Sequence, residues 1–342
     1  MKPVNRICFR LLAASLAGLA LLSSPLRAQS AEQTITLVNG WNAIWLEVQP
    51  TYPEGHARAG QPKAPADVFP DEVQTVITPK QLASTAEFFA EDPANAGSFN
   101  QEGWEQWRRP GGIDDNLMMV TGNRPYLIEV DGARGFTVEG KVRFHRPVWT
   151  ADRYNLIGFG LDGSPTFDDF FVPSGGKHPV DRIFRLNSSN GNWELVAGSD
   201  AMDSNHAYWI FSAGPSDYMG PVAVDFNGTR GGRLHFGGPA DAVTVDQGVD
   251  AKELDLDEIV FTNLGSSPAS PRLELVTNRD PAAGNPDDLE LYAVRPTDGS
   301  LAYQTVARID SAADDGNSSG LQESVAAQSS ATLTIGAKPV SY

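Results

Sequence analysis

Cysteine is almost missing from this 342-residue chain, whose only thiol is Cys8. A single cysteine cannot form an intramolecular disulfide, and it cannot build a cysteine-based metal cluster. We also expect no thiol nucleophile around Cys8. Cysteine chemistry is therefore excluded from the expected function.

Positive charge is also scarce, because 26 Lys and Arg residues face 43 Asp and Glu residues, for a net charge of −17. This sign opposes sequence-independent binding to nucleic acid or to an anionic membrane surface. Beyond residue 28 no stretch approaches the ~20 apolar residues of a transmembrane helix. We expect no nucleic-acid partner, and no membrane span once the N-terminal segment has been removed.

Residues 1–28 have the order of features that is typical of an export signal. A basic start precedes an apolar run from Leu11 to Leu22, and small residues permit cleavage after Ala28 or Ala31. An uncleaved N-terminal anchor is the alternative. The sequence therefore predicts export through a signal peptide, to the periplasm, the cell surface or the medium.

The rest of the chain predicts an all-β fold with little helix. Short runs rich in β-branched and aromatic residues are bounded by Gly, Pro, Asn or Asp. Helical patterns are limited to Pro79–Phe89, where Thr78 would be the cap, and to a single turn at Thr166–Phe171. The clearest strand candidates are residues 34–38, 43–48, 126–130 and 136–138.

Three aromatic segments recur in the same order along the chain. Residues 40–46 correspond to 153–159, residues 103–107 to 191–196, and residues 123–128 to 205–210. This self-similarity predicts two related β-modules, at 33–141 and 142–226. The first module is longer, most simply through residues 50–66 and 91–100.

Asn42 and Asn155 occupy the same place in the two copies. A short amide side chain beside a strand start commonly bonds to neighbouring backbone and fixes a turn. We assign both asparagines a structural role, with contact to a ligand as the alternative.

At these segments the chain resembles modules of large exported bacterial proteins, in which a Gly-Trp-Asn strand opens each unit and a Gly-Tyr-Trp-like strand closes it. The resemblance covers about 33–226, and the chain departs from it through Arg124-Pro125 and His206-Ala207 before the closing tyrosines. It implies an extracellular or surface-associated protein and a strand at 86–92 in place of the end of the helix. It supplies no catalytic residue.

The composition changes from about residue 227, because all seven Trp residues lie between 41 and 209. Seven short strands with turn signals predict a β-sandwich at 227–342, which resembles an immunoglobulin-like or fibronectin-like spacer domain. An acidic, Ala- and Ser-rich stretch near 310–330 predicts an exposed flexible loop. The strands are expected at 233–236, 242–245, 258–262, 272–276, 289–294, 303–309 and 332–335.

Motifs for catalysis are weak. The sequence from Gly158 to Gly163 matches the GxGxxG pattern, but Pro165 leaves room for only a turn of helix, so a bent strand is favoured over a dinucleotide site. The five histidines lack metal-binding spacing. Adjacent acids such as Asp168-Asp169 point apart in an extended chain, which favours solvated charge over a glycosidase pair. We expect neither an enzyme nor an organic cofactor.

Two acidic segments carry the oxygen ligands that Ca²⁺ prefers. One spans residues 250–257, and the other contains Asp310, Asp314, Asp315 and Asn317. Neither matches the spacing of an EF-hand loop. A structural Ca²⁺ site at the second segment is the alternative to simple solubilising charge.

Aromatic side chains are the most informative feature for function. Trp41 and Trp45 lie four residues apart, so they share one face of an extended strand, as in the stacking platforms of sugar-binding modules. Trp107, Tyr208 and Trp209 complete the candidate ligand-binding set. The competing interpretations are a hydrophobic core, favoured for the matching residues Trp104 and Trp193, and a protein interface.

Two classes of function follow. The leading hypothesis is a non-catalytic exported structural or interaction protein of the surface or adhesion type, with an extracellular protein or glycan as its partner. The alternative is a carbohydrate-binding protein that uses exposed Trp and Tyr, and a hydrolase is a distant third. Several aromatic rings lying flat on one surface would favour glycan binding, whereas their burial would favour a scaffold.

Overall fold

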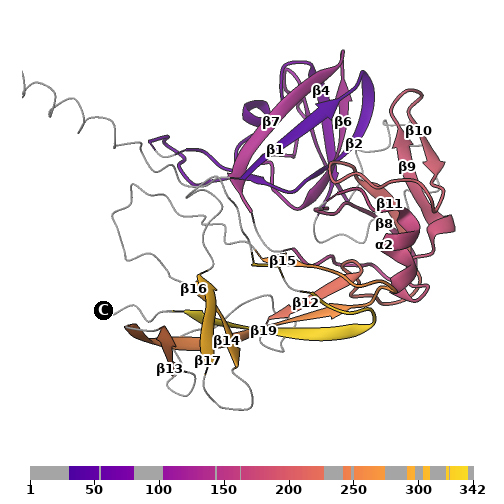
Figure 1. Ribbon diagram of the computed structural model, residues 1–342. Helices are drawn as coiled ribbons and strands as arrows, with labels where there is room; N and C mark the ends of the chain where they lie inside the picture. The colour runs from indigo at the N-terminus through magenta and orange to yellow at the C-terminus, as the bar shows by residue number, and fades with distance from the viewer. Residues whose placement is uncertain are drawn as a thin grey trace, which may run out of the picture.

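Strands dominate the computed structural model, which confirms the all-β prediction (Figure 1). It describes residues 31–53, 55–80, 103–142, 145–161, 163–226, 242–247, 250–273, 291–296, 303–308, 321–322 and 324–337. Within these ranges the helical segments are short: α1 (Pro65–Val68), α2 (Phe167–Phe171) and the 3-10 turns Val172–Ser174 and Val180–Arg182. No helix in the described ranges is long and apolar enough to cross a membrane.

Residues 31–141, which we call the first module, form two antiparallel sheets. The strand orders are β1-β7-β3 and β2-β6-β4-β5. Buried side chains from both sheets, among them Leu37, Ile44 and Ile128, form one hydrophobic core. The strands are β1 (Ala31–Leu37), β2 (Gly40–Leu46), β3 (Gln49–Pro50), β4 (Val73–Pro79), β5 (Trp104–Arg108), β6 (Arg124–Val130) and β7 (Arg134–Lys141).

Residues 145–218, which we call the second module, form one antiparallel sheet of order β10-β9-β11-β8. Helix α2 contributes Phe167, Phe170 and Phe171 to a core that also contains Ile157 and Ile210 of the sheet. Figure 1 shows this module, in rose, beside the first, in indigo to magenta. Its strands are β8 (Arg153–Ile157), β9 (Ile183–Asn187), β10 (Asn192–Leu195) and β11 (Tyr208–Ser212).

The four-stranded sheets of the two modules share one topology and one register. When the four strands of each sheet are numbered in chain order, the first pairs with the fourth, the fourth with the second, and the second with the third. Residue pairs at matching positions are also opposite each other in both sheets. The corresponding pairs are Ile44–Tyr126 with Ile157–Tyr208, and Pro79–Trp104 with Leu186–Trp193.

The remaining strands form a third sheet of order β12-β14-β19-β16-β17, in which β13 also pairs with β14. Because β12 belongs to it, this sheet begins before the boundary that the sequence placed after residue 226. Strands β15 and β18 form a separate ladder, and the predicted sandwich stays a prediction. The strands are β12 (Val222–Phe226), β13 (Ala242–Gln247), β14 (Asp250–Asn263), β15 (Arg272–Leu273), β16 (Leu291–Pro296), β17 (Tyr303–Arg308), β18 (Leu321–Gln322) and β19 (Ser329–Ala337).

Six of the seven strands expected at 227–342 overlap described strands, and the seventh, at 233–236, lies outside the described residues. The loop predicted near 310–330 is wrong in its second half. Strand β18 lies there, and Val325, only 1% exposed, exchanges backbone hydrogen bonds of 2.8 and 2.9 Å with Ala269. A buried apolar side chain and paired backbone hold this part of the chain against the sheet.

The two helix predictions have different outcomes. A helix starting at Pro79 is wrong, because Thr78 and Pro79 end strand β4, and residues 81–102 lie outside the described part. The Thr78 hydroxyl, predicted to cap a helix, donates to the Pro125 carbonyl at 2.7 Å. The turn predicted at 166–171 is confirmed as α2, where Thr166 Oγ1 accepts from the Asp169 N–H at 3.1 Å.

Candidate functional site

The two modules pack face to face through a buried layer, which we call the inter-module core. Its residues are Ala43, Ile77, Trp104 and Leu127 of the first module and Leu156, Leu186, Ala207 and Trp209 of the second. Trp209 meets Trp104 and Trp193 edge-on, at ring-centroid distances of 6.4 and 6.1 Å. Such edge-to-face pairs add to the stabilisation from burial. Trp104 and Trp193, for which a hydrophobic core was the favoured interpretation, thus both pack in one layer that the two modules share.

Trp45 reaches from β2 into the core of the second module. Gly158 leaves room for it, since a Cβ added there would lie 2.4 Å from Trp45 Cβ and 2.6 Å from the His206 carbonyl oxygen. A Cβ added at Gly160 would lie 2.3 Å from Glu47 Oε1, and burial raises the pKa of Glu47. The glycines of the predicted GxGxxG pattern therefore allow the first module to approach closely.

Main-chain hydrogen bonds also join the modules. The Trp45 N–H donates to the Asn205 carbonyl at 2.9 Å, and the Ala207 N–H donates to the Ala43 carbonyl at 3.1 Å. The Gln33 side-chain amide donates to the Trp45 carbonyl at 2.9 Å and to Asn205 Oδ1 at 3.0 Å. The edge of strand β2 is therefore paired with the second module.

Asn42 and Asn155 make the same set of contacts with backbone. Asn42 Oδ1 accepts from the Val38 N–H at 3.0 Å, and Asn42 Nδ2 donates to the Val38 and Gly40 carbonyls at 2.8 and 3.0 Å. Each side chain closes the turn that leads into its strand. In the second module, Asn155 Oδ1 accepts from the Thr150 N–H at 2.8 Å, and Asn155 Nδ2 donates to the Thr150 and Arg153 carbonyls at 3.2 and 3.1 Å.

Tyr126 and Tyr208 form a second matching pair. The Tyr126 hydroxyl accepts from the Thr121 N–H at 2.8 Å and donates to the Thr121 carbonyl at 2.9 Å. The Tyr208 hydroxyl does the same with Asp203, at 2.8 and 3.3 Å. Burial raises the pKa of Tyr126, and it raises that of Tyr208 to about 12. Each hydroxyl therefore stays protonated and ties its strand to the preceding loop.

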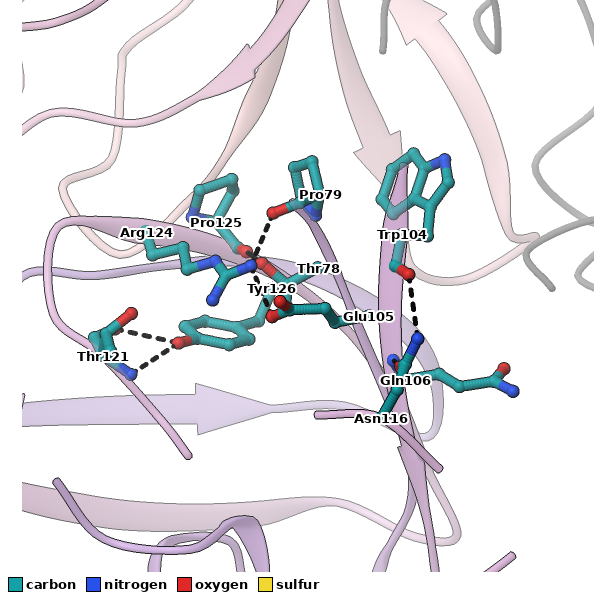
Figure 2. Close-up of polar contacts among 10 residues, drawn as sticks. All are labelled: Thr78, Pro79, Trp104, Glu105, Gln106, Asn116, Thr121, Arg124, Pro125 and Tyr126. Atoms are coloured by element: carbon teal, nitrogen blue, oxygen red, sulfur yellow. Dashed lines mark hydrogen bonds and ion pairs between the residues drawn. The ribbon is translucent and has the colours of Figure 1, made fainter. Parts of the chain in front are cut away.

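Arg124 is a buried cation at the end of β6, with 6% of its surface exposed. Its Nη2 donates to the Pro79 carbonyl at 2.6 Å and to Glu105 Oε2 at 2.7 Å. Figure 2 shows the guanidinium between these two acceptors, next to the Thr78 and Tyr126 contacts. A charge this deeply buried needs such partners. The network joins the ends of β4, β5 and β6.

The five predicted ligand-binding residues do not lie on one surface. Trp45, Tyr208 and Trp209 are buried, with 2, 1 and 4% of their surfaces exposed. Trp41 and Trp107 are half-buried on opposite faces of one sheet, because Trp41 packs against the inter-module core and Trp107 against the core of the first module. A flat stacking platform needs its rings on the same face.

The candidate calcium ligands Asp310, Asp314, Asp315 and Asn317 lie outside the described residues. The other acidic segment, residues 250–257, belongs to strand β14 and is not a loop. Among the described residues no group of three or more His, Cys, Asp or Glu side chains is placed to hold a metal ion.

His178 is a buried histidine that the sequence did not single out. The residue is 1% exposed, and the centroid of its ring lies 3.9 Å from that of the Trp149 ring. Nδ1 is 3.2 Å from the Phe211 carbonyl oxygen, and Nε2 is 2.8 Å from Ser216 Oγ. Burial lowers the pKa of His178 to about 4, so the ring is neutral near pH 7.

Exposed apolar side chains gather on the loop after β5, which the sequence analysis missed. Their exposed fractions are 105% for Ile113, 66% for Met118 and 50% for Met119. Leu117 and Val120 of the same loop are buried in the core of the first module. The loop thus has fixed anchors and presents the remaining apolar side chains to solvent. The alternation of buried and exposed apolar residues is visible in the sequence only once the anchors are known.

Comparisons of the chain with protein-family models, with curated proteins and with solved structures give no match.

Proposed function

We propose that this chain is an exported, non-catalytic interaction protein, in which the first two modules form one rigid body that presents binding surfaces to a partner protein outside the cytoplasm. The burial of Trp45, Tyr208 and Trp209, three of the five candidate ligand-binding residues, in the core of the second module and in the inter-module core carries the proposal. A glycan platform requires those rings at the surface. The export part rests on the features of residues 1–28.

The bonding of the buried polar side chains supports the same conclusion. Arg124, Tyr126, Tyr208 and His178 all contact backbone carbonyl oxygens, and these contacts brace strands and loops. Groups in these positions stabilise the fold. The exposed apolar side chains at Ile113, Met118 and Met119 are instead available to a partner, as exposed apolar patches commonly are.

A glycan array tests the carbohydrate alternative. We expect the chain without its signal segment to bind no glycan in a manner that depends on Trp41 or Trp107. Saturable glycan binding that is lost in Trp107→Ala, while the urea midpoint stays close to that of the parent, would overturn the proposal.

Cross-linking in the exporting cells tests the interaction itself. Because Cys8 is the only cysteine, a chain that has lost its signal segment can be labelled at one introduced thiol. We expect a photo-reactive probe at Ile113→Cys to give a discrete adduct with one exported protein. The matched control is Val172→Cys, which is also exposed, at 67%. Equal, diffuse labelling from both positions would contradict a specific surface.

A further inference from the structure

The outer edge of strand β5 is covered by the chain itself. Successive N–H groups of a strand point alternately toward and away from its neighbour. The Lys80 N–H donates to the Gly103 carbonyl and the Arg109 N–H to the Gln74 carbonyl, so residues 104, 106 and 108 direct their backbone groups away from β4. These outward groups need other partners.

Asn116 and Asp115, on the loop after β5, supply those partners. Asn116 Oδ1 accepts from the Gln106 N–H at 2.6 Å, and Asn116 Nδ2 donates to the Trp104 carbonyl at 3.3 Å. The Asn116 and Leu117 N–H groups donate to the Gln106 carbonyl at 3.0 and 2.9 Å. Asp115 Oδ2 accepts from the Arg108 N–H at 3.2 Å. This loop acts in place of a fifth strand.

Strand β10 is the counterpart of β5 in the second module, and its edge differs. The Val196 N–H donates to the Ile183 carbonyl, and Glu194 lies opposite Arg185, so Trp193 and Leu195 direct their backbone groups away from β9. Among the described residues no hydrogen bond to the backbone groups of Trp193 or Leu195 is present. An open edge of this kind is a template for strand addition.

The side chains of β10 indicate the chemistry of the added strand. Leu195 is 54% exposed, and Trp193 is half-buried against the inter-module core. Glu194 is exposed, and its carboxylate accepts from Asn187 Nδ2 at 2.8 Å and Asn190 Nδ2 at 3.1 Å. These bonds lower the pKa of Glu194, which keeps it anionic. An apolar pair on one face and a negative charge on the other favour a partner with the complementary pattern.

We infer that β10 binds an extended segment of a partner protein, which pairs with the backbone of Trp193 and Leu195 and places a lysine or arginine opposite Glu194. This inference rests on the proposed interaction function and names one of its sites. A second copy of this chain fits less well, because symmetric pairing about Glu194 would put two carboxylates opposite each other, and like charges there are unfavourable. The net charge of −17 also favours a basic partner segment.

Amide exchange measured by NMR on the chain without its signal segment tests the edge directly. In the free protein we expect rapid exchange at the Trp193 and Leu195 amides, whereas those of Gln106 and Arg108 exchange slowly because the loop after β5 covers them. A short peptide of alternating valine and threonine with a central lysine should slow exchange at Trp193 and Leu195. It should leave Gln106 unchanged.

Charge exchange tests the specificity of the site. We expect Glu194→Lys to lower the affinity for the lysine peptide by about two- to five-fold and to raise the affinity for a matched peptide with a central glutamate. Leu195→Ser should weaken the binding of both peptides, whereas Val172→Ser, at another exposed apolar residue, should leave their affinities unchanged.

Three results would overturn the inference. The first is slow exchange at Trp193 and Leu195 without any peptide in a monomer, and the second is a dimer that Glu194→Lys dissociates. The third is peptide binding only after residues 81–102 have been replaced by a short turn, because that would assign the edge to the chain itself. Cross-linking through Ile113→Cys does not involve β10, so it separates failure of this site from failure of the proposed function.

Discussion

Replacing Asn42 and Asn155 by alanine, singly and together, tests whether the two modules behave as one cooperative unit. Each carboxamide makes three hydrogen bonds with the backbone before its strand. Alanine removes all of them and leaves an N–H and two carbonyl groups without that partner. Asn42 lies in β2 and Asn155 in β8, but the backbone pairing of these strands with β6 and β11 does not use the two side chains, so the change reports chiefly on the turns.

The expected magnitudes differ because the burial of the two side chains differs. Asn42 is 6% exposed, so water replaces its bonds poorly, and the loss should be about 2–3 kcal/mol. Asn155 is half-buried, so partial hydration should limit the loss to about 1–2 kcal/mol. The sites share no hydrogen-bond partner, so the double variant should lose roughly the sum, about 3–5 kcal/mol.

Urea denaturation followed by tryptophan fluorescence is the appropriate assay, because all seven Trp residues lie between 41 and 209. We expect one transition, moved to lower urea by each single change and furthest by the double change. Asn192→Ala is the control, because this exposed asparagine should alter stability by no more than about 0.5 kcal/mol. Two separate transitions, each moved by only one variant, would refute a single cooperative body.

Two further predictions concern buried rings. Below pH 6.5 the unfolded chain takes up a proton at His178 that the folded chain, with a pKa of about 4 there, does not. The free energy of unfolding should therefore be unaffected by this group above pH 6.5, fall as the pH is lowered, and be about 3 kcal/mol smaller below pH 4. Urea midpoints between pH 7 and pH 4 should therefore fall less steeply for His178→Gln than for the parent, and equal slopes would contradict this. Trp209→Ala should cost about 3–5 kcal/mol in the same assay, because Trp104 and Trp193 lose their shared neighbour. Half-buried Trp107→Ala should cost less, and the reverse order would argue against the inter-module core.

The sequence alone determined the all-β class, many of the strands, the scarcity of helix and the matching aromatic segments. These are local properties: alternation of side chains along an extended backbone, turn residues at the ends, and the Thr166 cap of one short helix. The pairing of Ile44 with Tyr126 and of Ile157 with Tyr208 occurs at positions that the self-comparison had already aligned. Such features depend on residues close in sequence or on the spacing of similar segments.

The tertiary structure alone decided what each side of those strands contacts. The spacing of Trp41 and Trp45 places them on one face, but it does not state whether that face meets solvent, a ligand or another sheet. The packing of the second module against β2 buries Trp45 and brings it so close to Gly158 that no side chain fits there. Likewise, β5 and β10 occupy matching positions, yet among the described residues only β5 has a covered edge, because the loop that follows it folds back and brings Asp115 and Asn116 against the strand.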